Sequence, residues 1–461
     1  MPNQDLTIAA TFEGQKNFFA SGKTLALTVR KTQLKKLKEL LQANEERLYE
    51  AVYEDFCKSK FDTYTTEIAI LYQEIDEAIS HLSSWAKTQK VSTNWVNFPA
   101  KSFVMKEPLG VSLIIGAWNY PYQLLLAPAI AAISAGCSAV LKPSEQASAS
   151  SALMAELINQ HFDPGLLRVI EGGISETTEL LTLPWNKIFF TGSVRVGRIV
   201  YEAAAKNLVP VTLELGGKSP AVITEDCNLN MTVKRLVWAK YLNAGQTCIA
   251  PDYVMVQQNI AEDFINAMRK EIKKESFSIE NGNYVQIINN HNLTRLSRLL
   301  ENEHAAIGGS IDEKARVIEP TVLYPSSFQS KAMQEEIFGP ILPVIVYDQL
   351  ETVVDQINEA PKPLAAYIFT SKATTQDYFL TKVSFGGGAV NDAIMHISNS
   401  ALPFGGIGNS GIGAYRGKAG FDCFSHAKSI LQKSTLIELN LKYYPHTPGK
   451  LNWIRRILKM S

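Results

Sequence analysis

Two short glycine-containing segments carry side chains that could act together as a nucleophile and a general base. Glu214 opens the segment ELGGKSP, and Cys248 closes the segment NAGQTC. A thiol can attack an electrophilic carbon, and a carboxylate can accept a proton. Glycine beside such groups lets backbone or substrate approach closely. Each segment is weak support by itself, because most cysteines are small core residues and a Glu before Gly-Gly commonly ends a strand.

Four further segments accompany these two in a fixed order along the chain. They are WNYP at 118–121, KPSE at 142–145, FTGS at 190–193 and EEIFGP at 335–340. The six segments resemble the ordered motifs of the aldehyde dehydrogenase superfamily, and the similarity covers roughly residues 15–435. The segments LPFGGIGNSG at 402–411 and FSH at 424–426, the short N-terminus and the overall length resemble its class 3 branch of fatty and aromatic aldehyde dehydrogenases, in a bacterial-type form.

The resemblance assigns the reaction to three residues. Cys248 attacks the aldehyde to give a thiohemiacetal, whose oxygen accepts hydrogen bonds from the Asn119 side chain and the Cys248 backbone N–H. Oxyanion donors of this kind are each worth roughly 2.7–4 kcal/mol. Loss of hydride to a nicotinamide leaves a thioester, and Glu214 activates the water that hydrolyses it. Without the resemblance, Asn119 reads equally well as a turn residue before Tyr-Pro.

The resemblance also assigns a dinucleotide site, and the cofactor is expected to be NAD, with NADP as the alternative. Lys142 and Glu145 match the pair that holds the adenosine ribose; the carboxylate disfavours a 2′-phosphate and the lysine favours it. Glycines in TGSVRVG open a predicted helix after a strand, where backbone N–H groups attract a pyrophosphate. The full cofactor set is Trp118, Lys142, Glu145, Thr191, Gly192, Ser193, Gly197, Glu336 and Phe338, the last two matching residues that hold the nicotinamide ribose and ring.

Several apolar or aromatic residues lie beside these motifs. They are Tyr120, Trp238, Ile394, His396 and Phe404. These residues could line an apolar tunnel for medium- or long-chain aliphatic or aromatic aldehydes. Ordinary core packing explains each of them equally well. His396 is expected to be a hydrogen-bonded polar residue rather than a catalyst.

The elements that would position these residues follow from hydrophobic patterning. Residues 30–56 predict one helix with a solvent-facing side, and a second helix is expected around 66–89. From residue 110 onward short β-rich runs alternate with helical ones, which is typical of parallel βαβ units. Strands are expected at 111–115, 139–141, 167–170, 188–191 and 211–213, and in a second series at 221–223, 253–256 and 341–346. The motif residues at 119, 142 and 192 each follow a strand, where ligands of such sheets bind.

The predicted fold class is therefore α/β. The resemblance implies a Rossmann-type parallel-sheet cofactor domain, an α/β catalytic domain and a small bridging sheet that forms a homodimer. We expect the cofactor domain at 1–212, with bridging strands near 90–108, and the catalytic domain at 213–400. Residues 401–461 would form a C-terminal bridging and oligomerisation segment with an amphipathic tail.

Composition narrows the classes of partner. The chain has 461 residues, with 45 Lys plus Arg balanced by 45 Asp plus Glu, so no global charge favours nucleic acid. Five scattered cysteines fit a reducing compartment rather than a disulfide framework. The seven histidines show no paired ligand spacing, so no metal site is expected. The first ten residues lack the features of a secretory signal, and the apolar region 124–141 is interrupted by Pro, Gly and Ser. These features predict a cytoplasmic protein.

The C-terminal tail has a pattern of its own. Leu451, Ile454, Ile457 and Leu458 share one face of a predicted helix, and Asn452, Arg455, Arg456 and Lys459 share the other. Such a basic amphipathic helix is compatible with a membrane surface. Packing across a dimer interface is the favoured alternative, and peripheral membrane contact through 450–461 is the second.

The sequence thus predicts an NAD(P)-dependent enzyme that oxidises apolar aldehydes to carboxylic acids through a cysteine thioester. Two competing functions stay open at this point. One is a coenzyme A-acylating aldehyde dehydrogenase, which Glu214 disfavours because transfer to a thiol needs no base for water. The other is a family member recruited as a non-catalytic binding protein, which would not need the full set of motif residues.

Overall fold

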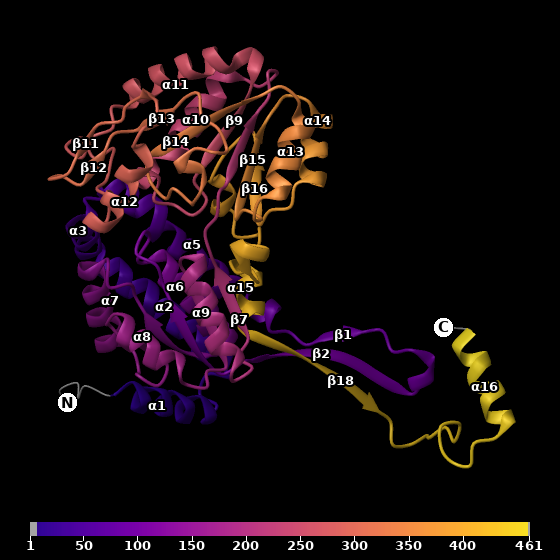
Figure 1. Cartoon of the computed structure of the whole chain (residues 1–461). Coiled ribbons are helices and arrows are strands. Elements are labelled where there is room, and N and C mark those ends of the chain that lie inside the picture. Colours follow the sequence, from indigo (N-terminus) through magenta and orange to yellow (C-terminus); the bar gives the residue numbers. More distant parts are fainter. Residues whose placement is uncertain (1–6, 460–461) are drawn as a thin grey trace.

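The computed structural model describes residues 7–459, which form two α/β lobes and a projecting arm (Figure 1). The first lobe contains a six-stranded sheet in the order β17-β7-β6-β3-β4-β5. All neighbouring strands are parallel except β17, which is antiparallel to β7. The strands are β3 (Val111–Ile115), β4 (Ser138–Lys142), β5 (Leu167–Val169), β6 (Lys187–Thr191), β7 (Val211–Glu214) and β17 (Gly411–Ile412).

Helices cover this sheet and connect its strands. The connecting helices are α6 (Gln123–Ala135), α7 (Ser148–His161), α8 (Ile174–Leu181) and α9 (Val194–Ala205). Every residue of β3, β4 and β6 is buried, so these strands are apolar runs rather than alternating patterns. The five strands predicted for this part of the chain are confirmed to within a residue or two at each end.

The second lobe contains a seven-stranded sheet in the order β10-β13-β14-β9-β8-β15-β16. Its strands are β8 (Pro220–Ile223), β9 (Tyr253–Gln257), β10 (Ala305–Ile307), β13 (Thr321–Leu323), β14 (Ile341–Tyr347), β15 (Ala365–Phe369) and β16 (Gly387–Val390), with a separate hairpin of β11 (Ile311–Asp312) and β12 (Val317–Ile318). The helices are α10 (Leu229–Tyr241), α11 (Ala261–Glu275), α12 (Asn290–Leu300), α13 (Leu350–Glu359) and α14 (Ala373–Lys382). The edge strand β10 is antiparallel and the other pairs are parallel, so the predicted second βα series is confirmed.

The N-terminal part is helical, with α1 (Ile8–Ala20), α2 (Leu27–Ala43), α3 (Glu45–Phe56), α4 (Lys60–Thr63), the π-helix η1 (Tyr64–Ile68) and α5 (Ala69–Trp85). The prediction of one helix over 30–56 is wrong, because α2 and α3 meet at Asn44 with φ −122° and ψ 15°. The Asn44 side chain donates to the Leu40 carbonyl at 2.9 Å, an alternative to helical pairing that asparagine commonly takes. The second predicted helix is also shorter than expected, since α5 ends at Trp85 and Gln89 begins a strand.

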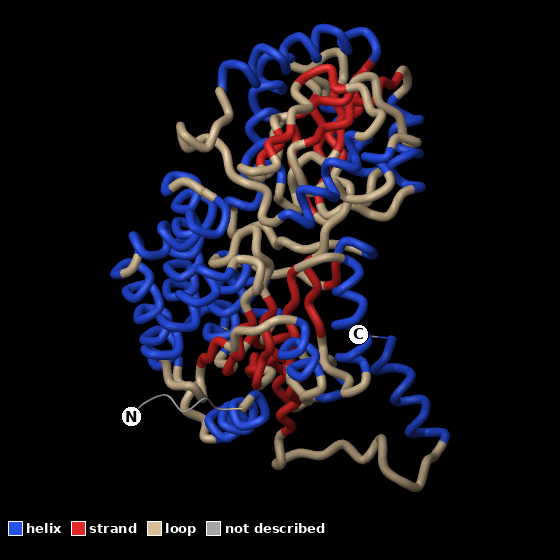
Figure 2. The backbone as a smooth tube through the Cα atoms, turned by 60° about the vertical axis from the view of Figure 1, so that its left-hand side comes forward, coloured by secondary structure: helices blue, strands red, loops and turns tan. Residues whose placement is uncertain are grey.

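The arm is a three-stranded antiparallel sheet that projects from the first lobe (Figure 1). Its strands are β1 (Gln89–Val91), β2 (Ala100–Pro108) and β18 (Ser425–Lys433), and the pairing of β2 with β18 runs from Pro108 opposite Ser425 to Ala100 opposite Lys433. The strands predicted near 90–108 are thus present. Helix α15 (Gly417–Cys423) precedes β18, and α16 (Pro448–Lys459) follows the arm as a separate helix (Figure 2).

Among residues 7–459, no helix has the length and apolar composition needed to cross a membrane. The apolar region 124–141 forms α6 and part of β4, and all thirteen residues of α6 are buried. This region is therefore core of the first lobe.

Candidate active site

Cys248 follows a turn in which three consecutive residues have left-handed backbone. The φ values are 55° at Asn243, 51° at Ala244 and 71° at Gly245. Left-handed residues other than glycine cost roughly 1–3 kcal/mol each and persist only where their surroundings hold them. A Cβ at Gly245 would overlap the Gly339 carbonyl, so only glycine fits there. The sequence after α10 is therefore bent sharply just before the thiol.

Gln246 holds this turn in place. Its side-chain nitrogen donates to the carbonyls of Asn243 at 3.1 Å and Gln286 at 3.0 Å, and its side-chain oxygen accepts from the Ile288 N–H at 3.0 Å. All of these bonds are buried or nearly so. The turn is thus hydrogen-bonded to the segment before α12, and these bonds fix the backbone two residues before Cys248.

Asn119 and Tyr120 come from the loop after β3 and reach the same turn from the other lobe. The Asn119 side-chain amide donates to the Gln246 backbone carbonyl at 3.0 Å. The Asn119 backbone carbonyl accepts from the Asn243 side-chain amide at 3.2 Å. The Tyr120 hydroxyl lies 2.6 Å from the Thr247 hydroxyl. The segments WNYP and NAGQTC are therefore hydrogen-bonded to each other.

The Cys248 thiol is strongly biased toward its neutral form. Burial, and after it the charges of Glu336 and Glu214, raises the pKa of this thiol to about 12. The backbone N–H groups of Cys248 and Ile249 oppose the shift. Since thiolate is the reactive form, attack on a substrate requires that the proton be removed.

Glu214 ends β7 and is 3% exposed. Neither of its carboxyl oxygens has a hydrogen-bond partner among the described residues. Burial raises the pKa of this carboxyl well above its ordinary value. A carboxylate with both oxygens free of partners among the described residues and a raised pKa is a stronger base toward a water molecule than an ordinary carboxylate.

Two cavities meet at Cys248. The first, of about 500 Å³, is lined by Ala117, Trp118, Asn119, Leu124, Thr191, Gly192, Ser193, Val194, Arg195, Glu214, Leu215, Gly216, Cys248, Asn292, Arg295, Glu335, Glu336 and Phe338. The second, of about 370 Å³, is lined mostly by apolar and aromatic side chains: Phe61, Asp62, Thr65, Thr66, Ile70, Tyr120, Gln123, Leu124, Trp238, Leu242, Thr247, Cys248, Ile249, Ile394, Met395, Ile397, Ser398 and Phe404. A thiol between a polar and an apolar cavity can face two different molecules.

The first cavity has the features that a dinucleotide needs. Ser193 caps the N-terminus of α9, and the free N–H groups of that helix start can bind a pyrophosphate. The buried Thr191 hydroxyl has no hydrogen-bond partner among the described residues and is available to a ligand. The rings of Trp118 and Phe338 meet edge to face at 5.5 Å. The residues present therefore fit such a cofactor.

Glu336 lies against Gly216, at a position that any side-chain carbon on residue 216 would occupy. Burial, and after it the charge of Asp252, raises the pKa of Glu336 to about 8, opposed by the Gly217 N–H. A carboxyl group here can accept hydrogen bonds from sugar hydroxyls. The glycine is thus required for the close approach of this side chain.

The predicted cofactor residues divide between this cavity and its surroundings. Trp118, Thr191, Gly192, Ser193, Glu336 and Phe338 line it. Gly197 lies within α9 and does not line the cavity; a side chain there would overlap Leu215. Lys142 is the last residue of β4 and Glu145 follows the strand; the Lys142 ammonium lies 3.8 Å from a Glu145 carboxyl oxygen, and neither residue lines the cavity. Burial lowers the pKa of Lys142, whose ammonium donates to the Pro143 carbonyl at 2.7 Å.

Four of the five residues predicted beside the substrate line the apolar cavity, and His396 does not. The His396 ring lies between Tyr367 and Phe404, with ring centroids 6.1 Å away in each case. The prediction that it is hydrogen-bonded is wrong, because neither ring nitrogen has a partner in the described chain. Burial lowers the pKa of this imidazole to about 4, so it packs as a neutral aromatic ring.

Sequence reasoning missed one wall of each cavity. Phe61, Asp62, Thr65, Thr66 and Ile70 come from α4, η1 and α5, where the sequence shows only an ordinary helical pattern. Arg195, Asn292 and Arg295 line the polar cavity. The first of these lies inside the motif TGSVRVG, so its place near the start of α9 could have been expected; the other two follow from tertiary structure alone.

Comparisons with known proteins agree with this geometry. Residues 5–430 match the model of the aldehyde dehydrogenase family. The chain is 43% identical to 4,4′-diaponeurosporen-aldehyde dehydrogenase of Staphylococcus aureus, over 98% of this chain and 99% of the relative. It is 42% identical to aldehyde dehydrogenase family 3 member A2 of Macaca fascicularis, over 94% and 90%.

Two further relatives bear on assembly and architecture. Aldehyde dehydrogenase, dimeric NADP-preferring, of Rattus norvegicus is 40% identical over 96% of this chain and 99% of its own. The solved structure of the substrate-bound state of Staphylococcus aureus AldH superposes with a TM-score of 0.95 at 43% identity, covering 98% of this chain and 99% of that one. The resemblance to class 3 and the predicted α/β fold are confirmed.

Proposed function

The chain belongs to the aldehyde dehydrogenase family, whose members oxidise aldehydes to carboxylic acids with NAD(P), and we propose that Cys248 is its nucleophile. The observation that carries this proposal is the position of the thiol, which lines both the polar and the apolar cavity. An aldehyde carbon in the apolar cavity and a cofactor in the polar one would both face the same sulfur atom.

The chain's own residues divide the remaining work. The Asn119 side-chain amide has two N–H donors, and one of them donates to the Gln246 carbonyl. The other N–H, together with the Cys248 backbone N–H, donates to the oxygen of the thiohemiacetal. Bound NAD(P) would supply the acceptor for the hydride that leaves this adduct, and the proton of the adduct's hydroxyl group would pass to solvent. Glu214 then takes a proton from the water that attacks the thioester, and the carboxylic acid departs as the thiol reforms.

The two competing functions predict different products. A coenzyme A-acylating enzyme would release an acyl thioester, and a recruited binding protein would release nothing. Within residues 7–459 neither carboxyl oxygen of Glu214 has a hydrogen-bond partner, and this side chain lines the same cavity as Cys248, which favours activation of water. Product analysis separates the three: a free acid supports the proposal, acyl-CoA formation contradicts hydrolysis, and absence of turnover with any aldehyde contradicts catalysis.

We assign the substrates to long apolar aldehydes, aliphatic or aromatic. The substrate-side cavity is walled by Tyr120, Trp238, Ile394 and Phe404 together with further apolar groups. Its one carboxyl group, Asp62, has a pKa raised by burial, opposed by the charge of Lys58. The name of the Staphylococcus aureus relative gives 4,4′-diaponeurosporen-aldehyde as that enzyme's substrate.

Turnover should rise with the length of the aldehyde. Each buried methylene contributes about 0.8 kcal/mol, so kcat/KM should increase by up to roughly fourfold per carbon until the cavity is filled. Replacing Trp238 by alanine should lower kcat/KM for long aldehydes and leave two-carbon aldehydes nearly unchanged. Initial rates of NADH and NADPH formation across a series from two to sixteen carbons, with benzaldehyde, measure both effects.

Met231→Ala provides the matched control for this series. Met231 is on the same helix as Trp238, is 46% exposed and lies outside the cavity. Its replacement should leave the dependence on chain length intact. A flat profile in the wild-type enzyme would contradict the assignment to long apolar aldehydes.

The domain limits and the cofactor preference extend the proposal. We assign 1–212 to cofactor binding, 213–400 to catalysis and 401–461 to bridging and the tail. Short segments cross these limits, since β17 joins the first sheet beside β7.

We also assign Lys142 and Glu145 to the adenosine ribose and expect NAD to be preferred, because a carboxylate at that place disfavours a 2′-phosphate.

We propose a homodimer formed through the arm. The arm leaves large apolar side chains exposed, including Val91 at 48%, Trp95 at 65% and Leu431 at 48%, which a second arm could cover. Residues 448–459 form the predicted tail helix α16, and Ile454 lines a cavity with Trp95 and Val96. On α16, Leu451 and Trp453 stay 48% and 58% exposed, so the tail has apolar surface for the partner subunit. The predicted tail residues 460 and 461 lie outside the described part of the chain.

Deleting residues 450–461 should weaken the dimer and leave lipid binding unaffected. Analytical ultracentrifugation measures dissociation of the full and truncated chains, and sedimentation with anionic vesicles measures membrane contact. Full-length protein that sediments with vesicles while the truncated chain does not would favour a membrane surface as the partner of α16.

We expect a cytoplasmic location, since a reactive thiol and four further free cysteines suit a reducing compartment.

A further inference from the structure

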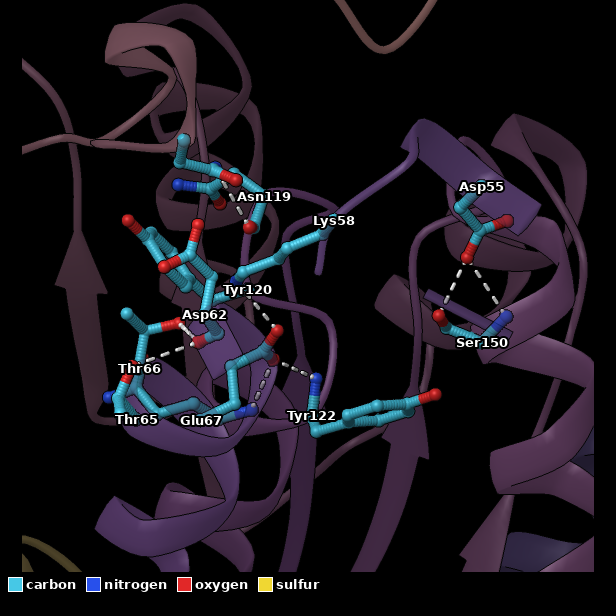
Figure 3. A network of polar contacts seen from close by, with 12 residues as sticks. Asp55, Lys58, Asp62, Thr65, Thr66, Glu67, Asn119, Tyr120, Tyr122 and Ser150 are labelled. Carbon is cyan, nitrogen blue, oxygen red and sulfur yellow. Dashed lines mark hydrogen bonds and ion pairs between the residues drawn. The ribbon is translucent and has the colours of Figure 1, made fainter. Parts of the chain in front are cut away.

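A buried ion pair lies behind the loop that carries Asn119 (Figure 3). Lys58 and Glu67 are both 0% exposed, and the ammonium lies 3.0 Å from one carboxyl oxygen. Taking two charges out of water is costly, and an apolar pair of similar volume is often as stable or more stable. Stability alone is therefore a weak explanation for this pair, and its other contacts indicate what it does.

Glu67 holds the start of α6. Its second carboxyl oxygen accepts hydrogen bonds from the N–H groups of Tyr122 at 2.8 Å and Gln123 at 3.2 Å. These N–H groups have no partner within the helix, and a negative charge at a helix N-terminus is favourable. Because Tyr122 follows Asn119 by three residues, the carboxylate fixes the end of the loop that presents the Asn119 amide.

Lys58 holds the middle of the same loop. Its ammonium lies 4.2 Å from the centroid of the Tyr120 ring, a cation–π contact that is strong where water is excluded. The hydroxyl at the far end of that ring meets the Thr247 hydroxyl at 2.6 Å, one residue before Cys248. The contact therefore runs from Lys58 through one aromatic ring to the segment of the nucleophile.

The pair also borders the substrate side. Glu67 lies in the π-helix η1, and Thr65 and Thr66 of the same turn line the apolar cavity with Asp62. Their hydroxyls donate to the Phe61 and Asp62 carbonyls at 2.8 and 2.5 Å, so this wall is internally hydrogen-bonded. π-Helical turns are frequent at functional sites. One short turn thus contributes the cavity wall on one side and the carboxylate on the other.

We propose that the Lys58–Glu67 ion pair is a positioning device for the reaction of Cys248. It holds residues 119–123 against residues 246–248, so that the Asn119 amide stays aligned with the sulfur atom while substrate fills the cavity. This inference rests on the proposed roles of Cys248 and Asn119. Both partners act through other groups, because neither of them lines either cavity.

Three variants test the device. Lys58→Met removes the cation, and Glu67→Gln keeps an acceptor oxygen for the two N–H groups but removes the charge. The double variant leaves no unpaired buried charge and should recover most of the stability lost in the single ones. All three should reduce kcat and the single-turnover rate of cofactor reduction about tenfold or more, because small misplacements of reacting groups are costly, while the KM for NAD stays unchanged.

Glu74→Gln is the matched control. Glu74 pairs with Arg416 in a second buried ion pair, 5% and 2% exposed, which contacts neither the 119–123 loop nor the 246–248 segment. This variant should lower the melting temperature and keep the wild-type single-turnover rate. Variants at 58 and 67 that lose stability but retain a rate within twofold of wild type would overturn the positioning role.

Wild-type enzyme and Cys248→Ser belong in the same assay. Turnover that survives in Cys248→Ser would overturn the proposed nucleophile itself, whatever the Lys58 variants do. Loss of turnover in Cys248→Ser with unchanged rates at Lys58 and Glu67 would overturn the positioning device alone. If Lys58→Met does not fold, the single-turnover rate of the double variant, which has no buried charge at either position, tests the positioning role instead.

Discussion

Replacing Cys248 by serine is expected to lower kcat/KM for every aldehyde by at least about 10³-fold. Serine retains the shape of the side chain, so both cavities and their bound molecules should be little changed. The hydroxyl, however, is a far weaker nucleophile than a thiolate. Initial rates of cofactor reduction measure the loss, and NAD binding measured by fluorescence titration should remain close to that of the wild type.

Cys227→Ser separates this effect from a general response to losing a thiol. Cys227 is half-buried and lines neither cavity. This variant should retain nearly wild-type turnover. If Cys248→Ser kept a substantial part of the wild-type rate, or Cys227→Ser lost its activity, the assignment of the nucleophile would fail.

Replacing Glu214 by glutamine should stop the reaction after its first half. The aldehyde can still be oxidised, so one equivalent of reduced cofactor per active site should appear rapidly. Hydrolysis of the thioester then lacks its base, and steady-state kcat should fall by on the order of 10²–10⁴-fold. Rapid-mixing measurement of the burst, with mass spectrometry of the acylated protein, tests both parts.

The pH dependence of this step has a definite sign. The pKa of Glu214 is raised by burial, so the basic carboxylate form becomes abundant only at a higher pH than for an ordinary carboxyl group, and its share grows as pH increases. The raised pKa of Cys248, about 12, acts in the same direction by increasing the thiolate fraction with pH. Wild-type turnover should therefore rise from mildly acidic to alkaline pH, and the burst phase of Glu214→Gln should rise as well.

The slow, steady-state phase of Glu214→Gln should rise less with pH than wild-type turnover does, because the variant has no carboxylate at this position to lose its proton. Glu225→Gln, a change at an exposed glutamate after β8, should keep the wild-type profile and show no burst. A Glu214→Gln enzyme with full steady-state turnover would mean that another group activates the hydrolytic water.

Much of the fold could be predicted because buried parallel strands have an unusual composition. Strands such as 111–115 and 341–346 read as short apolar runs between helical segments, and they are confirmed. The break at Asn44 could not be predicted from apolar spacing, since Leu41 and Leu48 on the two helices are both buried in the same core. The spacing of apolar residues indicates which face of a helix is buried, but it does not indicate where the backbone turns at a single residue.

The same distinction applies to the site. Cys248, Glu214 and Asn119 lie in sequence motifs, and the fold brings all three to one cavity. Lys58 lies between the two helices that the sequence predicts, and Glu67 lies at the start of the second one. Their complete burial depends on how α3, η1 and α6 pack, which local sequence does not encode. The same reason explains the wrong prediction for His396, because its lack of hydrogen-bond partners depends on how the rings of Tyr367 and Phe404 pack beside it.

The apolar cavity is assembled from four stretches of chain: residues 61–70, 120–124, 238–249 and 394–404. A ribosome adds roughly 5–20 residues per second, so the last stretch follows Cys248 by about 7–30 s. During that interval the nascent chain has a nucleophilic thiol and no completed pocket around it. The reactive sulfur is therefore least protected from oxidants and stray electrophiles while the enzyme is still being made.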